Sequence, residues 1–95
     1  MNLLDEPLPA SEARRIILRA LASGDVRFTS HALEEMAKDG ITQLEALGVL
    51  RSGVVEPAEL VRSTWRYRVR VRQAVVVAAF RSECAAVVIT AWRIR

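Results

Sequence analysis

Four arginines alternate with apolar side chains in the segment Thr64-Trp65-Arg66-Tyr67-Arg68-Val69-Arg70-Val71-Arg72. Successive side chains of a strand point to opposite faces, so this period of two predicts a strand with one apolar face and one arginine face. From Arg66 to Arg72 the guanidinium groups would extend over roughly 20 Å, at about 3.3 Å per residue. Like charges held in such a row repel one another, and the pattern therefore favours the binding of a polyanion.

Three interpretations of the arginine face stay open. Charged side chains can simply deter edge-to-edge aggregation of strands. They can also contact the phosphates of a nucleic acid, which dominate nucleic-acid affinity, or bind an acidic protein. Trp65, Tyr67 and Trp92 could stack on unpaired bases. Trp65 and Tyr67 have the opposite parity from the arginines, however, which favours core packing for Tyr67.

His31 is the only histidine and falls in the first turn of a predicted helix. The positive end of the helix dipole disfavours an imidazolium ion there, and a neutral imidazole can accept a proton from a substrate hydroxyl. The alternative is a polar side chain that hydrogen-bonds at a helix start. His31 is thus one candidate for acid–base chemistry.

Thr90 is a lone hydroxyl in the apolar segment Val87-Val88-Ile89-Thr90-Ala91-Trp92-Arg93. It is either an ordinary β-branched strand residue or a contact to a phosphate or to His31. Arg93 has the opposite parity from Thr90 and Trp92, so a regular strand cannot bring all three to one face without a bulge.

The remaining reactive side chains are weaker candidates. Glu34 and Glu35 are expected on a solvated helix face, and Cys84 has no base beside it in the sequence. One cysteine cannot form an internal disulfide, and with one histidine it provides no zinc-ligand set. We expect no metal or other cofactor.

Helices must precede the strands to position these residues. Ser11 can cap a helix that ends near Ser23 before Gly24, and Ser30 a second helix over residues 31–38 that ends at Gly40. Thr42 and Glu45 form a capping box for a third helix, which ends at Gly53. The strands are expected at residues 54–56, from 65 to 70 or 72, at 74–80 and at 85–94, with residues 26–29 as a short strand or an extended lead-in. These elements predict an α+β fold, with N-terminal helices packed on one face of a C-terminal three- to four-stranded antiparallel sheet.

Length and composition are consistent with one domain. The chain has 95 residues, of which 52% are hydrophobic, enough for a single core. We expect residues 1–10 to form a flexible leader and residues 11–95 the domain. No apolar run approaches the roughly 18 residues of a membrane span, and the start of the chain lacks the features of a signal peptide. These observations predict a cytoplasmic protein with no membrane partner.

Charge is divided between the two parts of the chain. Residues 1–60 hold six Lys or Arg against ten Asp or Glu, whereas residues 61–95 hold eight Arg against one Glu. Thirteen of the fourteen basic residues are arginine, and arginine is the better bidentate phosphate ligand. The sheet is therefore expected to be basic and the helices mostly acidic.

Three segments together resemble the bacterial family called domain of unknown function 4258: residues 28–36 with the His31-Ala32 helix start, residues 65–69 with Trp-Arg-Tyr, and residues 87–93. The resemblance covers roughly residues 24–94. That family is similar to RelE/ParE-like toxins, which implies a compact α+β fold with helices followed by an antiparallel sheet. One departure is Lys38-Asp39, where such sequences often carry an arginine before the Gly-Ile pair.

The lone histidine and the basic strand, strengthened by the resemblance, lead to the hypothesis of a RelE-like toxin-type ribonuclease that cleaves RNA without a metal ion. The residues then expected in catalysis are His31, Arg66 and Thr90, and those expected in binding are Tyr67, Arg68, Arg70, Trp92 and Arg93. RNA or the ribosome would be the partner, with an acidic antitoxin protein and a homodimer as further expectations. The alternative is a non-catalytic module that binds nucleic acid or an acidic protein on an inactive toxin scaffold. Whether His31 lies on the arginine side of the sheet decides between the two.

Overall fold

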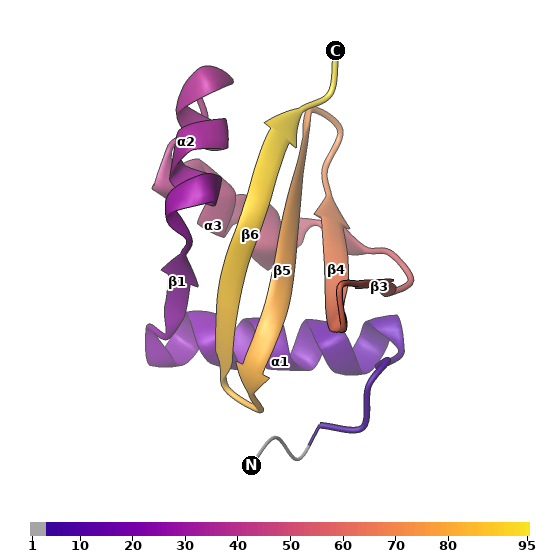
Figure 1. The fold of residues 1–95 in the computed structure, drawn as a ribbon. Helices are drawn as coiled ribbons and strands as arrows, with labels where there is room; N and C mark the ends of the chain where they lie inside the picture. Colours follow the sequence, from indigo (N-terminus) through magenta and orange to yellow (C-terminus); the bar gives the residue numbers. More distant parts are fainter. Residues whose placement is uncertain (1–3) are drawn as a thin grey trace.

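The protein is described by a computed structural model over residues 4–95, which contain three α-helices and a six-stranded mixed sheet (Figure 1). The helices are α1 (Ala10–Ser23), α2 (Ser30–Lys38) and α3 (Gln43–Ser52). The strands are β1 (Val26–Phe28), β2 (Val54–Val55), β3 (Glu59–Val61), β4 (Thr64–Arg70), β5 (Ala74–Ser82) and β6 (Ala85–Arg93). The predicted α+β class is confirmed.

The helix boundaries follow local capping chemistry. Helix α1 begins one residue before the expected Ser11 cap, after Pro9, and ends at Gly24 with a φ of 74°. Thr29 rather than Ser30 caps α2, where its Oγ1 accepts a hydrogen bond from the Ala32 N–H. Thr42 caps α3 as predicted, accepting from the Glu45 N–H at 3.0 Å.

The sheet is larger than predicted and is not purely antiparallel. Its strand order is β1-β6-β5-β4-β2, and β3 pairs with the other end of β4. Strand β1 runs parallel to β6, whereas the remaining pairs are antiparallel. The prediction of three to four antiparallel strands was therefore wrong. Strand β3 was missed because three residues are too few for an alternation to be visible in the sequence, and the parallel pairing of β1 with β6 joins segments about 60 residues apart, for which the sequence has no local signal.

The helices cover one face of this sheet. Helices α1 and α3 lie behind the sheet in Figure 1, and α2 lies beside β6 at the β1 edge. Tyr67 and Val69 of β4, Val76 of β5 and Val88 of β6 are fully buried in the core between these layers. The opposite face carries no helix among residues 4–95, and we call it the open face.

A bulge in β6 sets which of its residues reach the open face. Val77 pairs with Thr90 and Ala78 pairs with Val88, which leaves Ile89 as an extra residue. Without this residue, Thr90 would share the buried face of Val88. The bulge turns Thr90 and Trp92 to the open face instead.

The described part of the predicted leader contacts the domain. Leu8 is 8% exposed and belongs to the core. Its N–H donates to the Tyr67 hydroxyl at 2.9 Å, and that hydroxyl donates to the Glu6 carboxylate at 3.0 Å. Residues 1–3 of the leader lie outside the described residues. Among the helices described, none combines the length and apolar character needed to cross a bilayer.

Candidate functional site: two adjoining hollows on the open sheet face

Strand β4 carries the arginine row on the open face. Its burial alternates as predicted, with Tyr67 and Val69 buried and Arg68 and Arg70 exposed. Arg68 pairs with Val77 of β5, which in turn pairs with Thr90 of β6. The register therefore aligns a cation and a hydroxyl across three adjacent strands.

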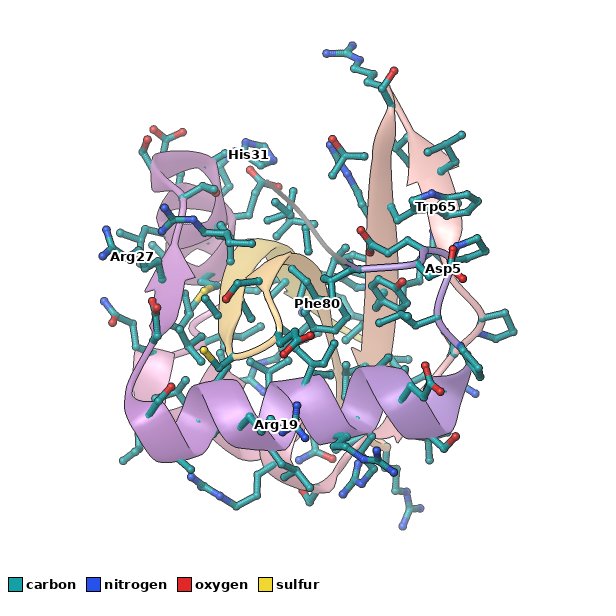
Figure 2. All side chains as sticks on the ribbon, turned by 90° about the horizontal axis from the view of Figure 1, so that it is seen from below. Asp5, Arg19, Arg27, His31, Trp65 and Phe80 are labelled. Carbon is teal, nitrogen blue, oxygen red and sulfur yellow. The ribbon has the colours of Figure 1, made fainter. Side chains whose placement is uncertain are left out.

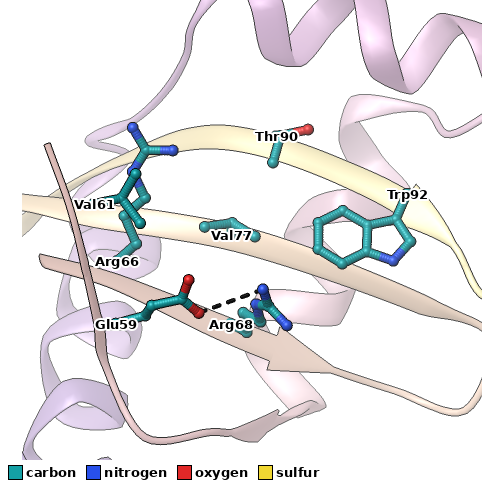
Figure 3. A pocket seen from close by; sticks show the side chains of 7 residues that line it. All are labelled: Glu59, Val61, Arg66, Arg68, Val77, Thr90 and Trp92. Atoms are coloured by element: carbon teal, nitrogen blue, oxygen red, sulfur yellow. Dashed lines mark ion pairs between the residues drawn. The ribbon is translucent and has the colours of Figure 1, made fainter. Parts of the chain in front are cut away.

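The cross-strand set of Arg68, Val77 and Thr90 forms the floor of the first hollow, whose volume is ≈ 180 Å³. We call it the Trp92 hollow; Figure 3 shows the side chains around it, which are Glu59, Val61, Arg66, Arg68, Val77, Thr90 and Trp92. Strand β3 crosses over one end and supplies Glu59 and Val61, while the indole of Trp92 closes the other end. Apolar walls and charged groups thus meet in one small site.

Acidic residues pair with two of the arginines of β4. Arg68 lies 3.4 Å from Glu59, and Arg70 lies 3.4 Å from Glu56. The Arg68 guanidinium also lies over the Trp92 ring, 5.7 Å from its centroid. The Arg68 and Glu59 side chains are 48% and 57% exposed, and ion pairs this open to solvent contribute little. Both arginines therefore remain able to bind an anion.

Arg66 differs from its neighbours because no acidic group pairs with it among residues 4–95. Its Nε atom is buried and has no hydrogen-bond partner. A buried N–H left unpaired costs about 1–3 kcal/mol, so native proteins seldom keep one without a reason. Arg66 also lines both hollows of the open face. Among the arginines of β4, Arg66 is therefore the one that lines both hollows and has no acidic partner within residues 4–95.

The second hollow adjoins the first and contains the histidine; we call it the His31 hollow. It has a volume of ≈ 610 Å³ and is lined by Thr29, His31, Val61, Arg62, Arg66 and Ile89. His31 is exposed in the first turn of α2, on the side of the sheet away from α1 (Figure 2). The cap that starts this helix also ties it to β6, because the Thr29 Oγ1 donates to the Ile89 carbonyl at 3.3 Å. His31 therefore lies on the same side of the sheet as Arg66.

Arg62 and Glu59 are candidate site residues that the sequence did not suggest. Arg62 and Ser63 form the two-residue loop between β3 and β4, and both have positive φ values, 49° and 68°. Such a type I′ turn usually contains Asn-Gly, and Arg62-Ser63 lacks that signal. The alternation over Glu59, Leu60 and Val61 is too short to predict a strand. Without the hairpin, nothing in the sequence places Arg62 beside His31.

Three predicted binding residues lie outside both hollows, and the first two are Tyr67 and Arg70. Tyr67 is fully buried on the helix side, with its ring centroid 4.7 Å from that of Phe80. Burial, together with the nearby Glu6 carboxylate, raises the pKa of Tyr67 to about 12. Arg70 lies on the open face but lines a separate depression with Arg72 and Ile94.

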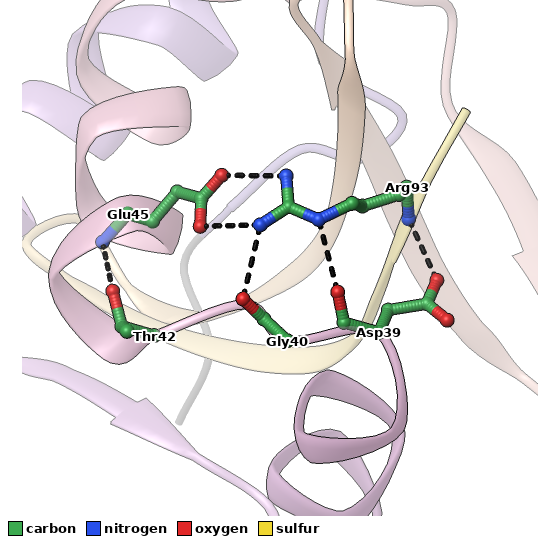
Figure 4. A network of polar contacts seen from close by, with 5 residues as sticks. All are labelled: Asp39, Gly40, Thr42, Glu45 and Arg93. Atoms are coloured by element: carbon green, nitrogen blue, oxygen red, sulfur yellow. Dashed lines mark hydrogen bonds and ion pairs between the residues drawn. The ribbon is translucent and has the colours of Figure 1, made fainter. Parts of the chain in front are cut away.

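Arg93 is also separate, since it holds the α2–α3 connection against β6 (Figure 4). Its guanidinium donates to both carboxylate oxygens of Glu45, at 2.8 and 2.9 Å, and to the carbonyls of Asp39 and Gly40. These bonds lower the pKa of the Glu45 carboxyl. The Asp39 carboxylate accepts the Arg93 backbone N–H, which lowers the pKa of Asp39 as well. Arg93 is thus engaged within the protein.

The other reactive side chains form no additional site. Glu35 pairs with Lys38 at 2.9 Å, and this hydrogen bond lowers the Glu35 pKa. Cys84 is exposed in the turn between β5 and β6. Within residues 4–95, no three His, Cys, Asp or Glu side chains gather in a way that could hold a metal ion.

Comparison with known proteins gives one match. The family model described as Domain of unknown function (DUF4258) matches residues 28–93. The match includes the whole of α2 with His31, α3 and all strands from β2 to β6. No curated protein and no solved structure matches the chain.

Proposed function

The chain belongs to the family of domain of unknown function 4258, and from this membership and the two hollows we propose a RelE-like toxin-type ribonuclease that cleaves RNA without a metal ion. The observation that carries the proposal is that His31 and Arg66 line the same hollow. Apart from β1, which lies between α1 and α2, the helices precede the strands, an order that is compatible with a toxin of this type. An acidic antitoxin is the protein partner that such an activity would require.

The proposed reaction is an internal transesterification. The ribose 2′-hydroxyl gives its proton to the neutral His31 imidazole as its oxygen bonds to the adjacent phosphorus. The bond from phosphorus to the 5′-oxygen breaks, and that oxygen takes a proton from the His31 imidazolium or from water. The products are a 2′,3′-cyclic phosphate and a 5′-hydroxyl.

The arginines stabilise the charge that accumulates on the phosphate during this step. Arg66 is adjacent to both hollows and donates to the phosphoryl oxygens, with Arg62 and Arg68 on either side. Thr90 contributes a hydroxyl from the floor of the Trp92 hollow. Tyr67 has no role in the step because it lies on the opposite face.

The test is cleavage of RNA, free or on translating ribosomes, in excess EDTA. Removal of a general base typically lowers the rate by about 10²–10⁴, which is the loss expected for His31→Ala. Arg66→Ala should lower it by about 10²–10³, as for removal of one transition-state donor. Arg19→Ala, on α1 at the other side of the molecule (Figure 2), is the matched control and should cleave normally. Absence of cleavage by the wild type, or equal cleavage by all variants, would contradict the proposal.

A second candidate is a module that binds nucleic acid without cleaving it. The observation in its favour is the burial of Tyr67, because the hydroxyl of the single tyrosine lies across the sheet from His31 and cannot protonate the leaving oxygen. This candidate predicts RNA binding that weakens with salt and is unchanged by His31→Ala, with no cleaved product.

A further inference from the structure

We infer that the Trp92 hollow is a binding site for a guanine base. This inference rests on the proposed function, since it specifies which nucleotide lies next to the phosphate held by Arg66. It comes from side chains of the hollow other than Arg66, the main phosphate ligand. These are the Glu59 carboxylate, its partner Arg68 and the Trp92 indole (Figure 3).

The indole of Trp92 provides a surface for a planar ring. Stacking of a base on an aromatic side chain is favourable for any base, and the apolar Val61 and Val77 complete the walls. Trp92 is only partly exposed, and Arg68 already lies over its ring. These features favour an unpaired base but do not distinguish among the four.

Glu59 and Arg68 provide the discrimination. An ionised carboxylate only accepts hydrogen bonds and a guanidinium only donates them, and here the two groups lie 3.4 Å apart. The hollow therefore presents one hydrogen-bond donor group, the Arg68 guanidinium, beside two acceptor oxygens of the Glu59 carboxylate. The edge of guanine has the complementary order, with the O6 acceptor followed by the N1–H and N2–H donors. Adenine, cytosine and uracil can each pair one acceptor with Arg68 and one donor with Glu59, but none of them presents a second adjacent donor, so one carboxylate oxygen stays without a partner.

Fluorescence of Trp92 can measure this binding directly. The chain has two tryptophans, so a Trp65→Phe background leaves Trp92 as the only reporter. The ligands are single-stranded oligouridylates with one central guanosine, inosine, adenosine or cytidine, alongside free 5′-GMP, 5′-IMP and 5′-AMP. We expect guanosine to bind about tenfold more tightly than adenosine or cytidine, as expected for a bidentate base contact. Inosine lacks the N2 amino group and should lie between them.

Two isosteric variants test the role of the carboxylate. Glu59→Gln should reduce the preference for guanine about tenfold, while binding of plain oligouridylate is retained. Glu56→Gln is the matched control, because Glu56 pairs with the next arginine of the same row but does not line the hollow. It should retain the preference.

The outcomes separate the inference from the proposed function. Equal affinity for all bases, or a guanine preference that survives Glu59→Gln, overturns the guanine site, whereas RNA cleavage that depends on His31 would persist. Selective binding of 5′-GMP without binding of any oligonucleotide supports the guanine site, identifies a free nucleotide as its ligand and overturns RNA as the substrate. Loss of the preference in Glu56→Gln as well as Glu59→Gln also overturns the inference, since general charge would then explain it.

Discussion

Tyr67 and Arg66 are neighbours on β4, yet one is enclosed by the core and the other lines both hollows. The Tyr67 hydroxyl joins the N-terminal residues to the sheet, since it accepts the Leu8 N–H and donates to Glu6. Its role therefore concerns stability, and substitution of this residue should leave RNA binding unchanged.

Tyr67 makes the protein sensitive to alkaline pH. Its pKa is about 12 in the folded state and about 10 when unfolded. The unfolded chain therefore loses this proton first as the pH rises. The resulting loss of stability begins above about pH 10, at up to about 1.4 kcal/mol per pH unit, and ends near the folded pKa. Below about pH 10, the contribution of the Tyr67 hydroxyl to the stability of the fold is fully present.

Comparison with Tyr67→Phe isolates this effect. At neutral pH, the variant should be less stable by about 1–2 kcal/mol, because the Leu8 N–H loses its acceptor. Between about pH 10 and 12 the difference should shrink as the wild type loses stability. Urea unfolding at each pH measures the difference in the free energy of unfolding between the two proteins. Tyrosinate absorbance reports the titration of Tyr67 alone, because it is the only tyrosine in the sequence. A folded-state titration at the ordinary tyrosine pKa would contradict the prediction.

At the scale of elements, the β3–β4 hairpin completes the candidate site. Its turn holds two non-glycine residues at positive φ, which is unfavourable for L-amino acids. The strained turn places Arg62 in the His31 hollow and brings Glu59 and Val61 over the Trp92 hollow.

Substitutions in this turn should separate strain from binding. Ser63→Gly should raise the free energy of unfolding by about 0.5–1 kcal/mol, because glycine adopts positive φ without steric conflict. Ser63→Ala keeps the Cβ and should therefore not raise the free energy of unfolding. Arg62→Asn should preserve stability, since asparagine tolerates this backbone region, while weakening RNA binding severalfold through loss of one phosphate contact. Thermal unfolding and RNA titration test the two parts, and stabilisation by Ser63→Ala would contradict the first.

The hairpin and the bulge also show where prediction from sequence ended. The helices were predictable because their signals are local: Thr42 caps α3, and Gly24 ends α1. The two faces of β4 followed from its seven-residue alternation. The turn at Arg62 lacks the residues that its backbone favours. The extra residue at Ile89 depends on pairing with β5 and on the Thr29 contact, neither of which is local. The sequence could therefore identify residue types of the candidate site, but it could not show which of these residues the fold brings together.

Across the whole molecule, the arginines of β4 lie together on the open face, but the helices on the other face are not acidic. The three helices hold four acidic and five basic residues, so the prediction of mostly acidic helices was wrong. Two acidic residues of the first 60, Glu56 and Glu59, instead pair with Arg70 and Arg68. The proposed function predicts that RNA binds at this row of arginines. Its affinity should then depend on salt through specific arginines rather than through net charge.

The dependence of RNA affinity on salt measures how many arginines contact phosphates. For a single strand, the slope of log K against log salt concentration falls by about 0.7 for each phosphate contact that is lost. Arg66→Ala, Arg68→Ala and Arg62→Asn should each reduce the slope by about this amount. Arg19→Ala removes the same charge from α1 on the far side and should leave the slope unchanged. An equal reduction in Arg19→Ala would show that net charge drives binding, because only a localised site can distinguish between arginines on opposite faces.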